Sequence, residues 1–348
     1  MKALVLEGPH ELNLRDIDVP KPGVEDALIK VEAIGVCRSD HHFWEWGPDS
    51  GMMNFDGPKV MGHEISGTVV ETGKDVTNFK VGDRVVIPFS GSDGTCKYCN
   101  SGQPHLCENS YIPGVSYIGG YAEYVCVPKA NRNLAHLPDE LSFLNGAALG
   151  CRFITAFHGL VDRAAITIGE NVVVFGCGGV GLSAINISKA AGANVIAVDI
   201  NPENLKLAKV MGADTIINSN DVGAVAEIQK LTSGGADLAV DALGLEVTVN
   251  NCIASLKKGG RLLQIGITTK NGGNVSVPMT SVVMREISVI GTLGMPPFRY
   301  ESIWPMLSAG KLDPSKMVTG EISISQVNDV FKEMSNNTVK GTNVVTSF

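Results

Sequence analysis

The segment from Asn171 to Ala191 constrains the fold of this chain more than any other stretch. Asn171–Phe175 is an apolar, mostly β-branched run that is typical of a buried strand. It leads into the glycine-rich hexapeptide Gly176–Gly181 (GCGGVG), and Val180–Ala191 then has the length and composition of a helix. A G-x-G-x-x-G pattern between a strand and a helix predicts a site that binds a dinucleotide.

The residues of this hexapeptide have separate physical roles. Gly176 permits the tight turn, Gly178 lets the backbone approach a pyrophosphate, and Gly181 lets helix and strand pack closely. The start of the helix, at Gly179 and Val180, presents free N–H groups and a positive dipole end to the phosphates. The alternative is a glycine-rich turn without a ligand, which the strand–turn–helix context disfavours.

Asp199 is expected to distinguish between the two common dinucleotides. It ends the next predicted strand, Asn194–Val198. A carboxylate at this position can accept hydrogen bonds from both ribose hydroxyls and would repel a 2′-phosphate, which favours NAD over NADP. The alternative interpretation is an ordinary surface aspartate.

The chain has 348 residues, which predicts about two domains. Residues 1 to about 150 have short predicted strands cut by glycine and proline, and from about residue 165 strands alternate with helices. This alternation predicts an α/β fold with a doubly wound parallel sheet. Beyond the segments named above, its further strands are predicted at Thr215–Ile217, Asp237–Val240, Arg261–Ile265 and Ile287–Ile290.

Composition excludes several classes of protein. The net charge is −8, which disfavours a nucleic-acid binder or a protein bound to anionic membranes. No apolar run reaches the length of about 20 residues that a membrane helix needs, and no signal peptide is recognisable. We therefore expect a cytoplasmic protein, in which the eight cysteines are thiols or metal ligands rather than disulfides.

A cysteine-rich lobe predicts a structural zinc site. Cys96 and Cys99 form a C-x-x-C pair, Cys107 follows, and Asp93 precedes them at the same spacing of three. Four ligands that close a tetrahedral shell hold zinc for structure rather than for catalysis. The alternatives are a vacant lobe and a redox pair, but a thioredoxin-like redox motif belongs near a βαβ unit.

A second possible metal site is dispersed along the chain, at Cys37, His63, Glu64 and Cys151. A catalytic zinc uses three protein ligands and leaves one position open. Sequence distance cannot bring these residues together, so spacing alone leaves this site as one possibility beside ordinary packing.

Taken together, the motifs resemble those of the zinc-dependent alcohol dehydrogenases of the medium-chain dehydrogenase/reductase superfamily, and the resemblance covers essentially the whole chain. It is carried by the following residues: Gly35–His42, the Gly62-His63-Glu64 motif with Gly67, Gly73 and Val76, the Cys96/Cys99/Cys107 lobe, Leu149–Cys151, and Gly176–Gly181 with Asp199.

The resemblance implies a role for each matching residue. Cys37, His63 and Cys151 match the ligands of the catalytic zinc. Glu64 matches a neighbouring carboxylate that can approach the metal during ligand exchange. Asp40 matches the acid that orients the zinc-binding histidine, here His63.

Four further residues can be compared with family positions that contact the substrate, transfer its proton or bind metal. Ser39 matches the hydroxyl that contacts the substrate oxygen, and His42 matches the last histidine of the proton relay. Asp93 stands where the family usually has a cysteine, which leaves the metal affinity of the lobe open. Cys151 differs from the glutamate common in polyol dehydrogenases, which favours simple alcohols and aldehydes.

Three aromatic residues are candidates for the substrate pocket: Phe89, Trp44 and Trp46. Phe89 matches a position that often lines the cleft in the family, and the two tryptophans follow the relay histidine closely. Ordinary packing is the alternative, because aromatic residues are commonly buried for packing alone.

The resemblance also implies an architecture and a reaction. A GroES-like β catalytic domain would comprise residues 1–152 and 295–348, and a Rossmann NAD-binding domain residues 153–294. The enzyme would use zinc and NAD to interconvert alcohols and aldehydes or ketones, as a homodimer or homotetramer. One alternative is an NAD-dependent polyol or other secondary-alcohol dehydrogenase of the same superfamily. A second is a zinc-free reductase, which would lack Cys37, His63 and the cysteine lobe, and a third is a non-enzymatic protein, such as a zinc-ribbon nucleic-acid binder or a structural protein.

Overall fold

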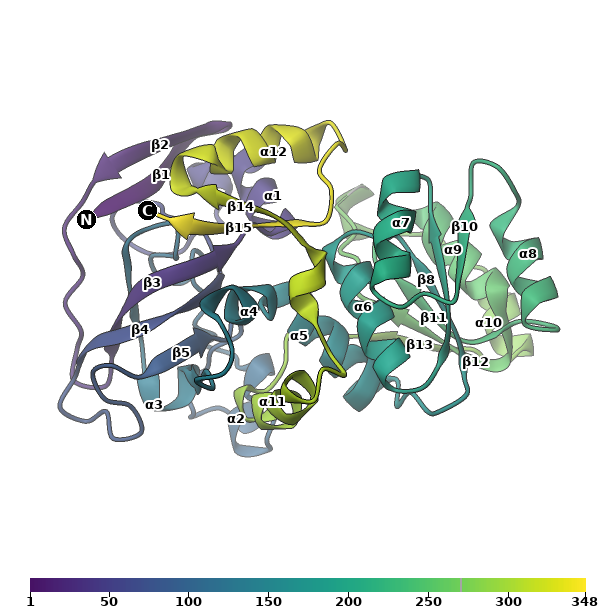
Figure 1. The fold of residues 1–348 in the computed structure, drawn as a ribbon, viewed down its shortest axis with the longest axis horizontal. Coiled ribbons are helices and arrows are strands. Elements are labelled where there is room, and N and C mark those ends of the chain that lie inside the picture. Colours follow the sequence, from purple (N-terminus) through teal and green to yellow (C-terminus); the bar gives the residue numbers. More distant parts are fainter. Residues whose placement is uncertain (270) are drawn as a thin grey trace. The chain divides into compact units, whose positions relative to one another are not determined.

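The structure is a computed structural model that describes residues 1–269 and 271–348. The chain divides into two compact units (Figure 1). The first unit comprises Met1–Cys151, Gly294–Gly310 and Val318–Phe348, and the second comprises Arg152–Leu293 and Lys311–Met317. This division differs from the expected boundaries at Arg152, at Gly294 and in one longer segment. Lys311–Met317 belongs to the second unit, where the backbone N–H of Asp313 donates to Asn186 Oδ1 at 3.1 Å.

The first unit is built on β-sheet. A seven-stranded sheet has the order β14-β15-β3-β4-β5-β7, with β6 paired to β3, and β1 and β2 form a separate antiparallel pair. The strands are β1 Lys2–Gly8, β2 Glu11–Asp16, β3 Ala27–Gly35, β4 Glu64–Thr72, β5 Arg84–Ile87, β6 Tyr124–Val127, β7 Ala135–His136, β14 Val318–Ser323 and β15 Thr342–Ser347.

Short helices accompany these strands. They are α1 Arg38–Trp46, α2 Lys97–Asn100, α3 Ala130–Asn133, α4 Phe143–Ala148, α11 Tyr300–Ser308 and α12 Val327–Ser335. The apolar core of the unit gathers residues from both ends of the chain, including Ile29 and Val31 of β3, Ile65 of β4 and Phe331 of α12. The C-terminal segment is therefore part of the same core as the N-terminal strands.

The second unit contains the predicted parallel sheet. Its strand order is β10-β9-β8-β11-β12-β13, and every neighbouring pair is parallel. This order is that of a doubly wound dinucleotide-binding fold, so the predicted α/β class is confirmed. Its strands are β8 Asn171–Phe175, β9 Asn194–Asp199, β10 Thr215–Asn218, β11 Ala236–Asp241, β12 Leu256–Gln264 and β13 Ser288–Gly291. Its helices are α5 Cys151–Phe157, whose first residue belongs to the first unit, α6 Gly179–Ala190, α7 Pro202–Val210, α8 Ala224–Leu231, α9 Glu246–Ser255 and α10 Met279–Met284.

Local sequence explains why these elements begin where they do. Val172, Val173 and Val174 are fully buried, as expected for a central strand covered on both faces. The helix α7 starts at Pro202, and the side chain of Asn201 caps it by accepting from the N–H of Glu203 at 2.9 Å.

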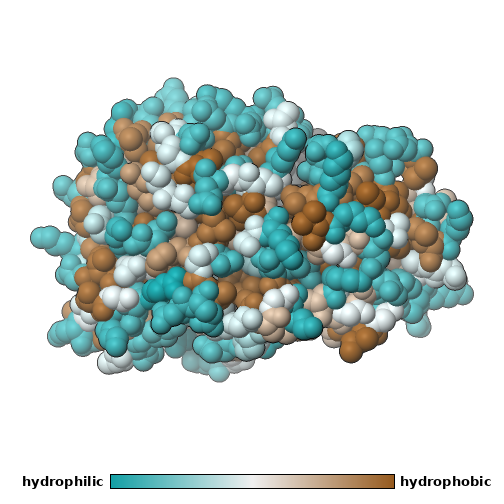
Figure 2. Space-filling view, in the orientation of Figure 1, coloured by the Kyte–Doolittle hydropathy of each residue, from teal (hydrophilic) through white to brown (hydrophobic). Residues whose placement is uncertain are grey.

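On the face shown in Figure 2, hydrophobic residues are interspersed among hydrophilic ones. Among the described residues, no helix combines the length and the apolar character that a membrane crossing requires.

Candidate active site and metal centres

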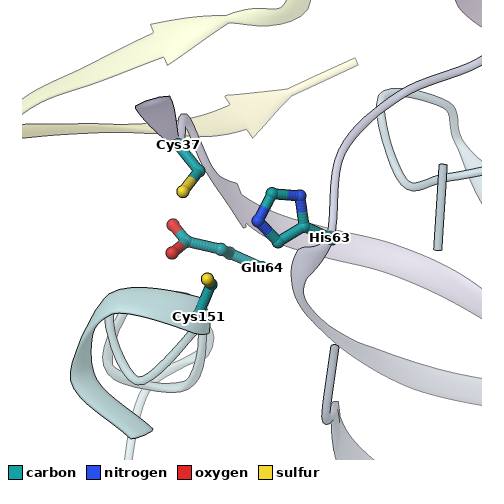
Figure 3. A group of neighbouring side chains, drawn as sticks. All are labelled: Cys37, His63, Glu64 and Cys151. Atoms are coloured by element: carbon teal, nitrogen blue, oxygen red, sulfur yellow. The ribbon is translucent and has the colours of Figure 1, made fainter. Parts of the chain in front are cut away.

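Four side chains meet in the first unit: Cys37, His63, Glu64 and Cys151 (Figure 3). Their ligand atoms all lie within 4.8 Å of one another. In Figure 3 the two sulfur atoms lie on either side of the Glu64 carboxylate, and the His63 ring faces the same space. The fold therefore brings together residues whose proximity their spacing in the sequence could not establish.

Strand pairing and one glycine create this cluster. Cys37 follows the end of β3 and Glu64 begins β4, and the antiparallel register places Gly35 opposite Glu64. Cys151 is the first residue of α5. The residue before it must be small, because a Cβ atom on Gly150 would lie 2.3 Å from Cβ of Glu64.

A buried aspartate, Asp40, forms hydrogen bonds with two residues of the cluster, His63 and Cys37. Asp40 is 1 % exposed, and its carboxylate accepts hydrogen bonds from His63 Nδ1 at 2.9 Å and from the Tyr121 hydroxyl at 3.0 Å. The backbone N–H groups of Gly62 and Cys37 also donate to it, at 3.2 and 3.3 Å. Because Nδ1 of His63 donates to Asp40, Nε2 keeps the lone pair that can bind a metal.

Tyr121 was not predicted from the sequence. It is fully buried, and burial together with the charge of Asp40 raises the pKa of its hydroxyl well above the ordinary value. The phenol therefore stays protonated and acts as a donor to Asp40. Tyr121 lies far from Asp40 in the sequence, and nothing in its local sequence signals this contact.

The electrostatics of His63 favour a bound cation. Burial acts to lower the pKa of the imidazole, but the neighbouring Asp40 and Cys37 outweigh it and raise the pKa well above the ordinary value. The ring is thus surrounded by groups that stabilise positive charge, and a metal ion can supply that charge.

The donor set of this cluster fits zinc. Sulfur and imidazole ligands are typical of zinc sites, and three such ligands with a nearby carboxylate match a site that keeps one position for another ligand. Cys37, His63 and Cys151 would hold the ion, with Glu64 beside them.

Ser39 and His42 lie on α1, next to the cluster in the sequence. The Ser39 hydroxyl is 3.8 Å from Cys37 Sγ. The side chain of His42 is 22 % exposed, and its ring stacks on Trp46 with centroids 5.5 Å apart. Ser39 is therefore close to the predicted ligand Cys37, and the ring of His42 reaches solvent.

Asp93, Cys96, Cys99 and Cys107 form a second compact cluster. Cys96 Sγ is 3.6 Å from Cys99 Sγ and 3.9 Å from Cys107 Sγ, and Asp93 Oδ1 is 3.7 Å from Cys99 Sγ and 3.3 Å from Cys107 Sγ. In tetrahedral zinc the corresponding S–S and S–O separations are about 3.8 and about 3.5 Å, given bonds of about 2.3 and about 2.0 Å. These four residues fit a closed zinc shell.

The carboxylate of Asp93 is fixed in a metal-binding orientation. It accepts from the backbone N–H and the hydroxyl of Thr95, at 2.8 and 2.7 Å, and from Asn109 Nδ2 at 2.9 Å. These hydrogen bonds, the backbone one first, lower the pKa of Asp93. Hydrogen bonds from the N–H groups of Cys99 and Glu108 lower the pKa of Cys96 to about 7. Both groups are therefore predisposed to bind as anions.

The glycine-rich hexapeptide has the geometry that a dinucleotide requires. A Cβ atom on Gly181 would lie 1.7 Å from the carbonyl oxygen of Gly176, so only glycine fits there. Gly178 faces open space, which leaves the backbone accessible. Asp199 ends β9, and its carboxylate accepts from the N–H groups of Cys177 at 2.6 Å and Asn201 at 2.8 Å. The residues present thus fit NAD.

The three predicted pocket residues lie in different surroundings. Phe89 is buried, with its ring 5.9 Å from that of His63. Trp46 is 45 % exposed beside His42. Trp44 packs in the core against Phe331, and its indole N–H donates to Asn328 Oδ1 at 3.0 Å, in agreement with the alternative of ordinary packing.

Comparison with known proteins covers both units. The family model described as "Alcohol dehydrogenase GroES-like domain" matches residues 23–139, and the one described as "Zinc-binding dehydrogenase" matches residues 179–309.

Individual relatives match along nearly the whole chain. An NAD-dependent alcohol dehydrogenase of Sulfurisphaera tokodaii is 34 % identical, with 97 % of each chain covered. A sorbitol dehydrogenase of Bacillus subtilis is 32 % identical, covering 95 % of this chain and 93 % of the relative. Among solved structures, the alcohol dehydrogenase TADH from Thermus sp. ATN1 has a TM-score of 0.90 at 27 % identity, with 99 % of each chain covered.

Proposed function

The chain belongs to the zinc-binding alcohol dehydrogenase family with a GroES-like domain, and from this premise we propose that it oxidises alcohols to aldehydes or ketones with NAD and catalyses the reverse reduction. The observation that supports this most directly is the convergence of two cysteines, a histidine and a glutamate at one point of the first unit. The second unit supplies the dinucleotide motif.

In this proposal the two cofactors supply chemistry that no side chain here can. Bound zinc would supply Lewis acidity, which lowers the pKa of a bound hydroxyl well below its ordinary value, and NAD would supply the hydride acceptor. Cys37, His63 and Cys151 hold the zinc, and the two sulfur ligands as thiolates balance its charge. Asp40 keeps His63 in the tautomer and orientation that binding needs.

Ser39 and His42 carry the proton of the alcohol from the substrate to solvent. We assign to the Ser39 hydroxyl the contact with the alcohol oxygen, since it lies 3.8 Å from Cys37 Sγ. His42 releases the proton to solvent, because its ring is partly exposed. Phe89, beside His63, lines the substrate side.

Polyols are the second candidate substrate class. The sorbitol dehydrogenase relative favours it, whereas a cysteine at position 151 favours simple alcohols. A panel of primary alcohols, secondary alcohols and polyols, assayed by NADH absorbance, separates the two classes by their kcat/KM.

Metal removal tests the proposal. We expect a chelator to abolish alcohol oxidation and added zinc to restore it. Cys37→Ala should lower both zinc content and activity, while the matched control Cys126→Ala, in β6 and outside both clusters, should retain them. Unimpaired turnover by metal-free protein, or full zinc occupancy in Cys37→Ala, would contradict the proposal.

We also propose that the protein is a homodimer or homotetramer that pairs through β13. This strand ends the six-stranded sheet, and Val289 in it is 55 % exposed. An exposed apolar edge strand promotes association.

A cytoplasmic location is part of the same proposal. All eight cysteines are free, and five of them belong to the two ligand clusters. Cysteines of cytoplasmic proteins more often bind metals than form disulfides.

A further inference from the structure

A third group of possible metal ligands lies on α1: His41, His42 and Glu45. It shares no ligand with either cluster described above. Glu45 Oε2 is 3.5 Å from Nδ1 of His41 and also 3.5 Å from Nδ1 of His42. Two imidazole nitrogens therefore face one carboxylate oxygen.

The hydrogen bonds of His41 fix which of its nitrogens carries a proton. Ser335 Oγ donates to the carbonyl of Phe331 at 3.2 Å, so it accepts from His41 Nε2, which is 2.8 Å away. Nε2 of His41 then carries the hydrogen and Nδ1 carries the lone pair. Among the described residues, this buried Nδ1 has no hydrogen-bond partner.

The arrangement places two electron-rich atoms face to face. The Nδ1 lone pair of His41 and the Glu45 carboxylate repel each other unless a cation lies between them. A proton is poorly suited to this position, because burial lowers the pKa of His41 to about 4 despite the charge of Glu45. A metal ion avoids this difficulty, because it binds the neutral imidazole.

The spacing suits a tetrahedral ion of the zinc type. With bonds of about 2.0–2.1 Å, nitrogen and oxygen ligands lie about 3.3 Å apart, close to the 3.5 Å found here. Two imidazoles and one carboxylate favour zinc, cobalt, nickel or copper over magnesium or calcium. The side chains of His42 and Glu45 are 22 % and 38 % exposed, so an ion can enter from solvent and keep a water ligand.

The rings are also held in place. His41 packs against both Trp44 and Phe331, with centroid distances of 5.6 and 6.0 Å, and His42 stacks on Trp46. His41 Nε2 is bound to Ser335, which is the support that metal-binding histidines usually have at the other nitrogen.

We propose that His41, His42 and Glu45 form a third metal site, for a divalent transition-metal ion such as zinc, and that an ion bound there inhibits the enzyme by removing His42 from proton release. The inhibition rests on the proposed function, whereas the binding does not. An imidazole with a metal on Nδ1 and a hydrogen on Nε2 has no lone pair left to accept a proton.

Direct binding tests the site. Holoenzyme freed of loosely bound metal is titrated with zinc by calorimetry, and bound zinc is counted by elemental analysis. We expect one more ion per chain after the titration than before it, and Glu45→Gln should weaken its binding at least about tenfold. Asp49→Asn, which removes one nearby exposed carboxylate, should bind as the original protein does.

Two results would overturn the site: no further ion in the original protein, or binding by Glu45→Gln as tight as by Asp49→Asn. Because Glu45 is partly exposed and glutamine has its shape, we expect Glu45→Gln to keep the fold and the activity without added zinc. Circular dichroism checks the fold.

Cobalt identifies the ligands. An ion held by nitrogen and oxygen gives visible d–d absorption without a sulfur-to-cobalt charge-transfer band. That is the expected spectrum of the additional ion, and a thiolate band would place the ion in a cysteine cluster and overturn the proposal.

Inhibition is the last readout. Excess zinc should slow alcohol oxidation at least about tenfold less effectively in Glu45→Gln than in the original protein, in line with the loss of affinity. Zinc that binds without slowing the original enzyme would overturn the inhibitory role. Absence of any alcohol turnover would refute the proposed function instead, and the calorimetry would still decide the metal site.

Discussion

At the scale of single residues, Asp40 orients His63 within the cluster of Cys37, His63, Glu64 and Cys151. One carboxylate, 1 % exposed, accepts from two backbone N–H groups, one phenol and one imidazole. These bonds tie together the chain around Cys37, the chain around His63, and Tyr121. A buried charge with so many donors is stable, and it fixes the ligand that it touches.

Replacing this carboxylate should therefore damage metal binding without removing a ligand. We expect Asp40→Asn to lower zinc affinity and kcat/KM by about 10–100-fold, because an amide no longer fixes the tautomer of His63. Zinc content after mild chelation and steady-state kinetics measure this. Tyr121→Phe removes one donor and keeps the charge, so its effect should be smaller, and equal effects would contradict the assignment.

Asp199 should determine the choice of dinucleotide. We expect Asp199→Ala to lower kcat/KM with NAD and to raise it with NADP, because the carboxylate no longer binds the ribose hydroxyls or repels a 2′-phosphate. The ratio of the two values, measured with one alcohol, is the readout. An unchanged ratio would show that the ribose assignment is wrong.

At the scale of elements, two glycines in the turn from β8 to α6 have different roles: Gly181 is needed for close packing and Gly178 for NADH binding. Gly181→Ala should lower the free energy of unfolding by about 1–3 kcal/mol or more, because its Cβ would meet the backbone of Gly176. The Cβ atom of Gly178→Ala would contact no other atom, so this variant should keep its free energy of unfolding and bind NADH more weakly. Urea unfolding and NADH fluorescence titration distinguish the two effects. Equal stability of both variants would contradict the close-packing argument.

The connection before β10 should give the protein an acid-sensitive contact. Asp214 accepts from Lys189 Nζ at 2.6 Å and from the N–H of Val195 at 2.8 Å. Partial burial acts to raise the pKa of Asp214, but these hydrogen bonds outweigh it and lower the pKa. A depressed folded-state pKa stabilises the fold above the unfolded value of about 3.9, and this stabilisation is lost as the pH falls through the folded-state pKa.

We therefore expect Asp214→Asn to lower the free energy of unfolding at neutral pH by less than about 1 kcal/mol, since the ion pair is exposed. The difference from the original protein should shrink as the pH falls below about 4. Urea unfolding at several pH values measures this, with Asp221→Asn as the exposed control. A difference that grows in acid would refute the sign.

At the scale of the whole molecule, the edge of the parallel sheet offers a test of assembly. We expect Val289→Asp, in β13, to shift the protein toward monomers, because a charge on an edge strand opposes pairing. Sedimentation velocity measures the change, and Val283→Asp on α10, also exposed, serves as the control. An unchanged oligomer would exclude this edge as the interface.

The sequence could predict what is local in the chain. Residues 171–191 predict the strand, the glycine-rich turn and the helix after it, because the glycines are required by close contacts and a tight turn within that segment. The lobe of Asp93, Cys96, Cys99 and Cys107 is equally local, since one short segment can place four ligands around one point.

The tertiary structure decided what depends on distant contacts. Cys37, His63 and Cys151 could be singled out only through resemblance to a family, because their proximity requires β3 to pair with β4 and Gly150 to approach Glu64. The hydrogen bond of Tyr121 and the core position of Trp44 have no local signature at all. Periodicity and spacing report on neighbours along the chain, whereas these contacts arise when segments far apart in sequence pack into one core.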